Sequence, residues 1–199
     1  QLNGFKSFAE KTNFLIEDGL TGIVGPNGCG KSNIVESLRW VMGETSAKSM
    51  RGSGMEDVIF SGTSNKTSKN IAEVSVSVNN PNKEGPIQYR ELDEVHVRRK
   101  IEKDKGSKFY INDKEVRARD AQMFFADLST GAHSPSMISQ GRIGALVTAK
   151  PTDRRAILEE AAGISGLHVR RHEAELRLSA AENNLKRADE LRRQQEKQL

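Results

Sequence analysis

Apolar and polar residues alternate along the middle of the chain in the pattern that half-buried β-strands show. In Val74–Val78 every second residue is valine with serine between, and Val95–Arg98 alternates in the same way. A period of two predicts strands. Phe109–Ile111 is followed by Asn112-Asp113, which predicts a hairpin turn. We therefore expect an antiparallel sheet over residues 71–117.

The amino-terminal part predicts strands that lead into a glycine-rich loop and then a helix. Apolar residues alternate loosely over Phe5–Ile16, Asp18-Gly19 marks a turn, and Leu20–Val24 predicts a short strand. After the loop, apolar residues share one helical face, and Gly43 follows them as a C-terminal cap. They are Ile34, Val35, Leu38, Val41 and Met42. Residues 48–69 are rich in Ser, Gly and Lys and predict a loop.

A further helix is predicted after Pro151. Thr152 is its expected N-cap, because a threonine hydroxyl accepts a hydrogen bond from the first helical turn. Gly163 and Gly166 are expected to interrupt this helix.

The last stretch predicts a coiled coil. From Leu167 onward glycine and proline are absent, and small or apolar residues repeat at steps of four and three, which indicates a narrow seam. The seam residues are Ala174, Leu178, Ala181, Leu185 and Ala188. Because Gln1 is not methionine and the spacing still runs at Leu199, we expect a piece of a longer protein. We divide it into a globular lobe, residues 1–163, and a neck with the start of a coiled coil, residues 164–199.

The composition fits one domain with a solvated appendage. Of 199 residues, 35% are hydrophobic, 5% aromatic and 29% charged, which is lean for a compact globule. The formal net charge of +4 permits a polyanion such as DNA as a partner but does not demonstrate one. Cys29 is the only cysteine, which excludes an intrachain disulfide and favours a reducing compartment. No apolar run approaches a membrane span, so we expect a cytoplasmic protein with no membrane partner.

The glycine-rich loop carries the clearest chemical signal. Gly25, Gly30, Lys31 and Ser32 fit the spacing G-x-x-x-x-G-K-[ST]. In such a loop the backbone N–H groups surround phosphates, the lysine neutralises the β- and γ-phosphates, and the serine hydroxyl binds Mg²⁺. A chance glycine turn is the plain alternative, and the expected strand before and helix after argue against it. Cys29 is interpreted as a small side chain that the loop tolerates rather than as a redox sensor.

Two segments imitate the remaining motifs of an ABC-type ATPase. Met123–Asp127 is an apolar run that ends in aspartate, like a Walker B strand, and Leu128–Gly131 resembles a degenerate signature. Their order is wrong, because in these ATPases the signature precedes Walker B. Leu128 also stands where a hydrolytic glutamate belongs. We interpret this region as a half-buried segment that ends in a loop, and we expect no catalytic residue in this chain.

Other site classes have weaker support. GTPases recognise guanine with the motif N-K-x-D. The pairs Asn65-Lys66 and Asn82-Lys83 are not followed by an aspartate at the required position. His168 and His172 are four residues apart, but no glutamate stands between them as in a zinc protease. We interpret them as part of a solvated helix face and expect no metal site there.

With these pieces in order, the chain resembles the amino-terminal half of an SMC (structural maintenance of chromosomes) head, of the bacterial chromosome-partition type. The resemblance runs over almost the whole chain. It rests on Gly4–Phe8, Gly25–Asn33, Met50–Gly52, Val58–Gly62, Ser139–Ile143, Arg154-Arg155 and Glu159–Ile164. It implies an α/β fold: the amino-terminal lobe of a P-loop ABC-type ATPase head, with an antiparallel sheet and the start of a long coiled-coil helix.

The resemblance also implies roles for matched residues. Those expected to bind ATP are Lys6, Ser7, Gly25, Pro26, Asn27, Gly28, Cys29, Gly30, Lys31, Ser32, Asn33, Arg51 and Gln140. Ser32 and Gln140 are expected to bind Mg²⁺, and Arg51 to reach the phosphates. Without the resemblance, the preferred interpretation is that Gln140 is an ordinary loop residue and that Arg51 is an ordinary surface charge. Arg117 and Arg119 are expected to face DNA, although acidic neighbours dilute their charge.

The implied protein is a composite ATPase. The carboxy-terminal half of the same protein would return with the signature, Walker B and the catalytic glutamate, and a second head would complete a homodimer around ATP. A kleisin-type subunit at the neck and DNA are the further expected partners, in a nucleoid-associated protein that segregates and condenses chromosomes. A RecN-type repair ATPase is the alternative; a P-loop kinase and a coiled-coil scaffold with a vestigial loop fit less well. Ser53-Gly54 departs from the family, where many relatives carry a lysine.

Overall fold

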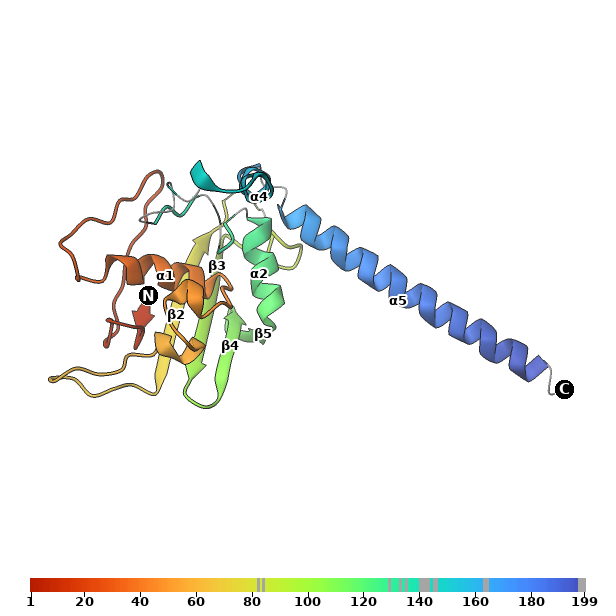
Figure 1. The fold of residues 1–199 in the computed structure, drawn as a ribbon, viewed down its shortest axis with the longest axis horizontal. Helices are drawn as coiled ribbons and strands as arrows, with labels where there is room; N and C mark the ends of the chain where they lie inside the picture. Colours follow the sequence, from red (N-terminus) through yellow and green to blue (C-terminus); the bar gives the residue numbers. More distant parts are fainter. Residues whose placement is uncertain are drawn as a thin grey trace.

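The fold is an antiparallel sheet that carries two helices on one face and a long projecting helix (Figure 1). A computed structural model describes residues 1–81, 83, 85–128, 130–132, 134, 136–139, 144, 147–162 and 165–196. Its strands are β1 (Leu2–Asn3), β2 (Ile71–Asn79), β3 (Glu94–Glu102), β4 (Gly106–Ile111) and β5 (Lys114–Val116). Its α-helices are α1 (Lys31–Val41), α2 (Ala118–Asp127), α4 (Pro151–Ala161) and α5 (Ser165–Glu196). Short 3₁₀ helices span Lys48–Met50 and Met55–Val58.

The sheet confirms the alternation seen in the sequence. Its five strands follow one another in the order β1-β2-β3-β4-β5, and each neighbouring pair is antiparallel. Val97 of β3 lies between Val76 of β2 and Ile111 of β4. The predicted hairpin joins β4 to β5 through Asn112 and Asp113, which both have positive φ (47° and 62°). Positive φ at both turn residues suits the right-handed twist of the strands.

One face of the sheet, together with α1 and α2, forms the hydrophobic core. The inward residues of β2, β3 and β4 alternate with outward ones, as a sheet covered on one face requires. The largest fully buried side chains are Trp40, Phe5, Phe124, Phe125, Met50, Ile101, Ile111, Val41, Val58, Val74, Val95 and Val97. Residues 48–69 therefore contribute Met50 and Val58 to this core, besides forming a loop.

Arg99, a charged residue on the buried face of β3, fastens α1 to the sheet. Its side chain is 3% exposed, and its guanidinium carbon lies 4.5 Å from the ring centroids of both Trp40 and Phe109. Nη1 donates to the carbonyl oxygens of Trp40 and Glu44, each at 2.7 Å, and Nε donates to Ser107 Oγ at 2.8 Å. Burial lowers the pKa of Arg99 to about 10, against an opposing effect of Glu44. The group stays charged at neutral pH, where it complements the negative end of the α1 dipole.

We expect Arg99→Met to lower the free energy of unfolding by about 2 kcal/mol, because the carbonyls of Trp40 and Glu44 lose a charged donor inside the core. Arg98→Met is the matched control, since Arg98 lies on the outer face of the same strand and pairs with Glu73. Its cost should stay below about 1 kcal/mol. Urea unfolding of the two variants measures the difference. Equal losses would contradict the anchoring role of Arg99.

The predicted strand Leu20–Val24 is wrong. The structure assigns no strand to these residues, and Leu20 is 99% exposed. The whole stretch 10–29 runs over the surface and joins β1 to α1 (Figure 1). The expectation over Phe5–Ile16 holds only in part, as single bridges at Phe5 and Thr12. A lone strand is not stable without a neighbour to satisfy its backbone, and the described residues supply none here.

The apolar face predicted for the helix after the loop is also displaced. α1 buries Glu36, Ser37, Trp40 and Val41, whereas Ile34, Val35, Leu38 and Met42 are only half-buried. The core-facing side is set by Trp40, which packs against Phe5 with ring centroids 5.5 Å apart. The predicted helix end is confirmed: Gly43, with φ of 104°, donates its N–H to Trp40.

The segment Met123–Asp127 is helical, as part of α2. It was expected to be half-buried, and its Phe124 and Phe125 are fully buried. A Walker B motif is a β-strand, so a helical Met123–Asp127 cannot be a Walker B motif. Of the signature look-alike, Ser129 lies outside the described residues.

The carboxy-terminal helices differ from the prediction at their ends. Pro151 occupies the first turn of α4, and the Lys150 carbonyl accepts the N–H groups of Asp153 and Arg154. Thr152 is therefore inside the helix and is not its N-cap, because proline suits the first helical position. Gly166 lies within α5 and does not interrupt it. Gly163 lies outside the described residues, as does the proposed lobe boundary at 163–164.

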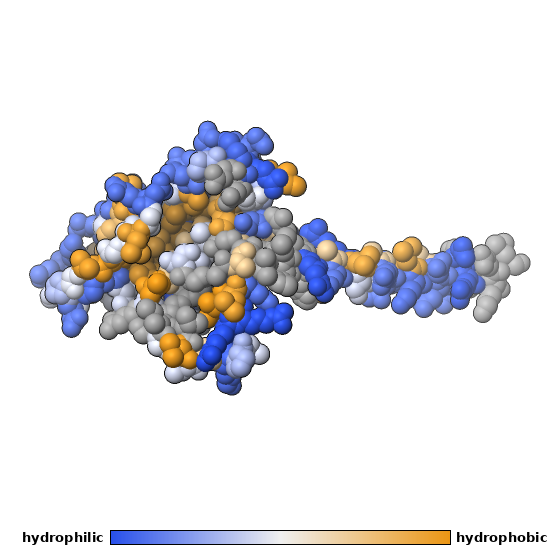
Figure 2. All heavy atoms as spheres, turned by 90° about the horizontal axis from the view of Figure 1, so that it is seen from above, coloured by the Kyte–Doolittle hydropathy of each residue, from blue (hydrophilic) through white to orange (hydrophobic). Residues whose placement is uncertain are grey.

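The helix α5 projects away from the globular part (Figure 1). The seam residues Leu178 and Leu185 are exposed, and hydrophobic atoms follow one side of the helix (Figure 2). The coiled-coil partner of this seam stays a prediction. In the portion of the chain that the structure describes, no helix has the length and apolar character needed to cross a membrane.

Candidate nucleotide-binding site

The glycine-rich loop turns tightly into the amino terminus of α1. Gly28 and Gly30 have φ of 82° and 92°, a left-handed region that glycine enters without steric cost. Gly30 is also crowded, since an added Cβ would lie 3.0 Å from Ser7 Oγ and 3.6 Å from the Phe8 ring. The first turn of α1 contains no acidic residue. Its N–H groups and the positive end of the helix dipole therefore favour an anion at this point.

Lys31 is the first residue of α1 and folds over the loop. Its Nζ donates to the carbonyl oxygens of Gly25 at 2.7 Å and Pro26 at 2.6 Å, and Cys29 Sγ lies 3.9 Å away. The structure gives Lys31 no carboxylate partner among the described residues. A phosphate can replace the neutral carbonyls with a stronger, charge-assisted interaction. Ser32 and Cys29 are exposed beside it. These residues fit the phosphates of a nucleoside triphosphate together with Mg²⁺.

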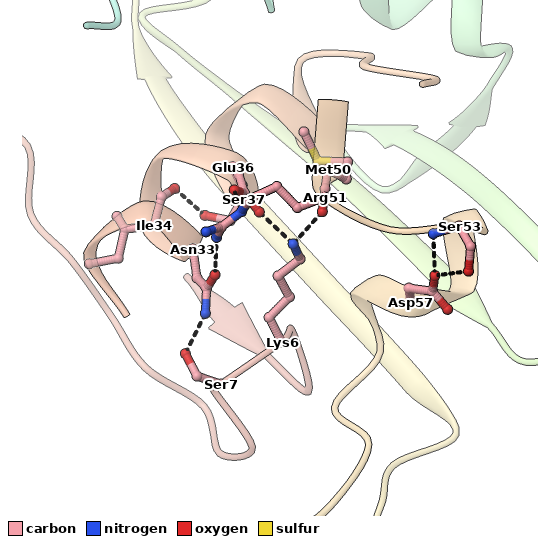
Figure 3. A network of polar contacts seen from close by, with 10 residues as sticks. All are labelled: Lys6, Ser7, Asn33, Ile34, Glu36, Ser37, Met50, Arg51, Ser53 and Asp57. Atoms are coloured by element: carbon pink, nitrogen blue, oxygen red, sulfur yellow. Dashed lines mark hydrogen bonds and ion pairs between the residues drawn. The ribbon is translucent and has the colours of Figure 1, made fainter. Parts of the chain in front are cut away.

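Four residues that the family resemblance assigns to the nucleotide, Lys6, Ser7, Asn33 and Arg51, come together at the first turns of α1 (Figure 3). Asn33 donates through Nδ2 to Ser7 Oγ at 2.8 Å and accepts from Arg51 Nη2 at 2.8 Å. Lys6 and Arg51 both bind Glu36. Segments far apart in the sequence thus meet at one end of the P-loop helix.

Glu36 is the residue at this site that the sequence interpretation missed. It lies in the second turn of α1, is 7% exposed, and forms ion pairs with both Lys6 and Arg51. The sequence shows that Glu36 stands four residues before Trp40, and therefore on the same helix face, but only the structure shows that this face is buried. A buried carboxylate needs a charged partner, and here it has two.

The segment after Arg51 is held by Asp57. Oδ2 of Asp57 accepts the N–H of Ser53 at 2.6 Å, the N–H of Gly54 at 2.9 Å and the Ser53 hydroxyl at 2.9 Å. These bonds, with that of Gly54 foremost, lower the pKa of Asp57. Ser53-Gly54, the departure from the family pattern, therefore shapes the turn that follows Arg51.

The other predicted site residues are Gln140, Arg117 and Arg119. Gln140 lies outside the described residues, so its Mg²⁺ role stays a prediction. Arg117 and Arg119 are exposed at the start of α2. Across the described ranges, no group of three or more His, Cys, Asp and Glu residues is arranged to hold a metal ion. The side chains of His168 and His172 lie outside the described set.

Comparison with known proteins gives a consistent family. Residues 1–143 match the model of the RecF/RecN/SMC N-terminal domain. The chromosome partition protein Smc of Rhodopseudomonas palustris is 56% identical over 191 residues, which are 96% of this chain and 17% of that protein. The chain thus spans about a sixth of the length of the curated relatives it matches.

Solved structures agree with the sequence matches. An Smc head with an extended coiled coil, bound to the C-terminal domain of ScpA and derived from Pyrococcus furiosus, is 33% identical with a TM-score of 0.73. The match covers 96% of this chain and 47% of that one. A structure from work on ATP-driven dimerization and DNA-stimulated activation of SMC ATPases is 31% identical with a TM-score of 0.69, covering 80% and 95%. The resemblance to SMC heads and the predicted α/β fold class with a coiled-coil helix are confirmed.

Proposed function

Because this chain belongs to the RecF/RecN/SMC N-terminal domain family, we propose that it is the ATP-binding half of a composite SMC-type ATPase. The observation that carries the proposal is the glycine loop at the start of α1, with Lys31 held over it and Arg51 brought beside it. ATP is the ligand, with its phosphates on the loop N–H groups and Lys31. Mg²⁺, which neutralises phosphate charge, is bound by Ser32 and Gln140.

The exposed apolar stretch before the loop supports the view that this chain is one half of a head. Its large exposed side chains are Phe14, Leu15, Ile16, Leu20, Ile23 and Val24, and hydrophobic atoms appear on the surface of the globular part (Figure 2). Exposed apolar patches are typical of surfaces that bind another protein, a ligand or a membrane. In this proposal the carboxy-terminal half covers it and supplies the signature, Walker B and the catalytic glutamate.

The full protein, in this proposal, works as a homodimer whose heads engage around ATP to load and move DNA in chromosome condensation and segregation. Solved relatives include SMC ATPases described by ATP-driven dimerization and DNA-stimulated activation, and Smc heads bound to ScpA domains. We therefore propose a kleisin-type subunit at the neck, a nucleoid-associated cytoplasmic location, and DNA contacts at Arg117 and Arg119. The curated relatives named Smc favour this function over that of a RecN-type repair ATPase.

Cys29 offers a direct test of nucleotide binding, because its thiol is exposed 3.9 Å from Lys31 Nζ. We expect maleimide to label Cys29 in the nucleotide-free protein, as followed by mass spectrometry of its peptide. Mg-ATP at about ten times its Kd should slow labelling roughly tenfold, since only about a tenth of the sites stay empty. Lys31→Ile protein, treated in the same way, is the control and should show little protection. Equal labelling rates while ATP is demonstrably bound would place the phosphates elsewhere.

A further inference from the structure

Glu36 stands at the centre of the polar network beside the loop (Figure 3). Each of its carboxylate oxygens forms an ion pair with a basic side chain: Oε2 with Lys6 Nζ and Oε1 with Arg51 Nε. The Glu36 side chain is 9% exposed, whereas that of Arg51 is 57% exposed. The carboxylate is therefore buried behind an arginine whose outer edge faces solvent.

The backbone of both cationic residues is unusual. Lys6 has φ of 46° and Arg51 has φ of 53°, a left-handed region that costs a residue with a side chain about 1 kcal/mol or more. Lys6 is held there by its N–H bond to the Val58 carbonyl at 2.7 Å and by its ammonium bond to the Met50 carbonyl. Arg51 is held by its N–H bond to Lys48 at 3.0 Å. Strain retained at two residues that meet on one carboxylate points to a functional arrangement rather than a surface ion pair.

The Arg51 guanidinium is fixed from two sides. Arg51 Nε forms an ion pair with Glu36 Oε1, and Arg51 Nη2 donates a hydrogen bond to Asn33 Oδ1. The guanidinium therefore lies along the first two turns of α1. Asn33 is in turn held by Ser7. A guanidinium has five N–H donors, and in the described part of the chain the side-chain contacts of Arg51 involve Nε and Nη2, which leaves the Nη1 donors for a ligand beside the first turns of α1. Two cations, Lys6 and Arg51, contact the one Glu36 carboxylate, so Glu36 does not cancel the positive charge of Arg51 by itself.

We propose that Glu36 is a positioning residue for the nucleotide site: it orients the Arg51 guanidinium toward the phosphates and keeps Lys6 beside it. This inference rests on the proposed function, in which Arg51 contacts the nucleotide. A charge that is already oriented stabilises developing charge without reorganisation during the reaction. Removing the group that orients it should therefore affect turnover more than nucleotide binding.

The test uses Glu36→Gln in the full-length protein that contains this chain. We expect kcat for ATP hydrolysis to fall about tenfold while KM changes less than about threefold. Glu36→Asp keeps the charge and should recover part of kcat. Glu73→Gln is the matched control, because Glu73 is a half-buried carboxylate that pairs with Arg98 on the sheet, and its kcat should be unchanged.

A double-mutant cycle with Arg51→Ala separates positioning from a structural role. If Glu36 acts through Arg51, Glu36→Gln causes no further loss of kcat in the Arg51→Ala background. If the double variant loses kcat by the product of the two single-variant factors, the two residues act independently and the inference is overturned. An unchanged kcat in a folded Glu36→Gln protein would also overturn it. Thermal unfolding checks folding; if the glutamine variant unfolds, Glu36→Asp enters the same cycle. An Arg51→Ala protein with normal turnover, by contrast, would contradict the assignment of Arg51 to the nucleotide.

Discussion

We expect that replacing Lys31 by Ile abolishes ATP-dependent head engagement in the full-length protein and leaves the fold intact. The Lys31 ammonium lies over the loop, and its oxygen partners among the described residues are the carbonyls of Gly25 and Pro26. Its loss removes the charge that faces the phosphates in the proposed site, while the loop glycines remain. Removing a charge-assisted contact of this kind costs about 2–3 kcal/mol, so we expect ATP affinity to fall roughly 30- to 150-fold.

ATP titration followed by size-exclusion chromatography measures binding and dimerisation together. Lys69→Ile, at an exposed lysine just before β2, is the control for the loss of one positive charge. Circular dichroism should show the same helix content in both variants. Lys31→Ile heads that dimerise at the normal ATP concentration would refute the role assigned to Lys31.

The largest effect is expected when this chain is purified alone: it should release no phosphate from ATP above background. The candidate site contains groups suited to binding phosphates, but the look-alike at Asp127 is the end of helix α2 and cannot serve as a Walker B strand. A missing general base alone costs about 10²–10⁴-fold in rate, and loss of the signature that closes over the γ-phosphate adds to this. Steady-state phosphate release by the chain alone and by the chain co-expressed with the carboxy-terminal half measures the difference.

Assembly of the two halves should depend on the seam of α5. Leu178 and Leu185 are exposed on this helix, so changing both to Asp should weaken the co-expressed complex and its ATP hydrolysis. Changing Ser179 and Asn183 to Asp, at exposed positions on the side of the helix away from the seam, is the matched control. Turnover by the isolated chain at the rate of the complex, abolished by Asp127→Asn, would overturn the half-enzyme proposal.

The sequence by itself determined the elements whose signals are local. The valine alternation of β2 and β3 sets which face is buried, because side chains on a strand alternate between faces. Asn112-Asp113 specifies a two-residue turn, since both residues tolerate positive φ. The glycine loop and the helix start at Lys31 follow from the same local rules. The resemblance added Lys6, Ser7 and Arg51, which local rules do not connect.

Only the tertiary structure decided how distant segments meet. It showed that Leu20–Val24 has no neighbouring strand among the described residues, that Trp40 sets the buried face of α1, and that Arg99 is buried between aromatic rings. It also placed Lys6 and Arg51 on the same carboxylate of Glu36. Strand pairing and the burial of a charge depend on partners far along the chain, and the pattern of one segment contains no information about which partner it will reach.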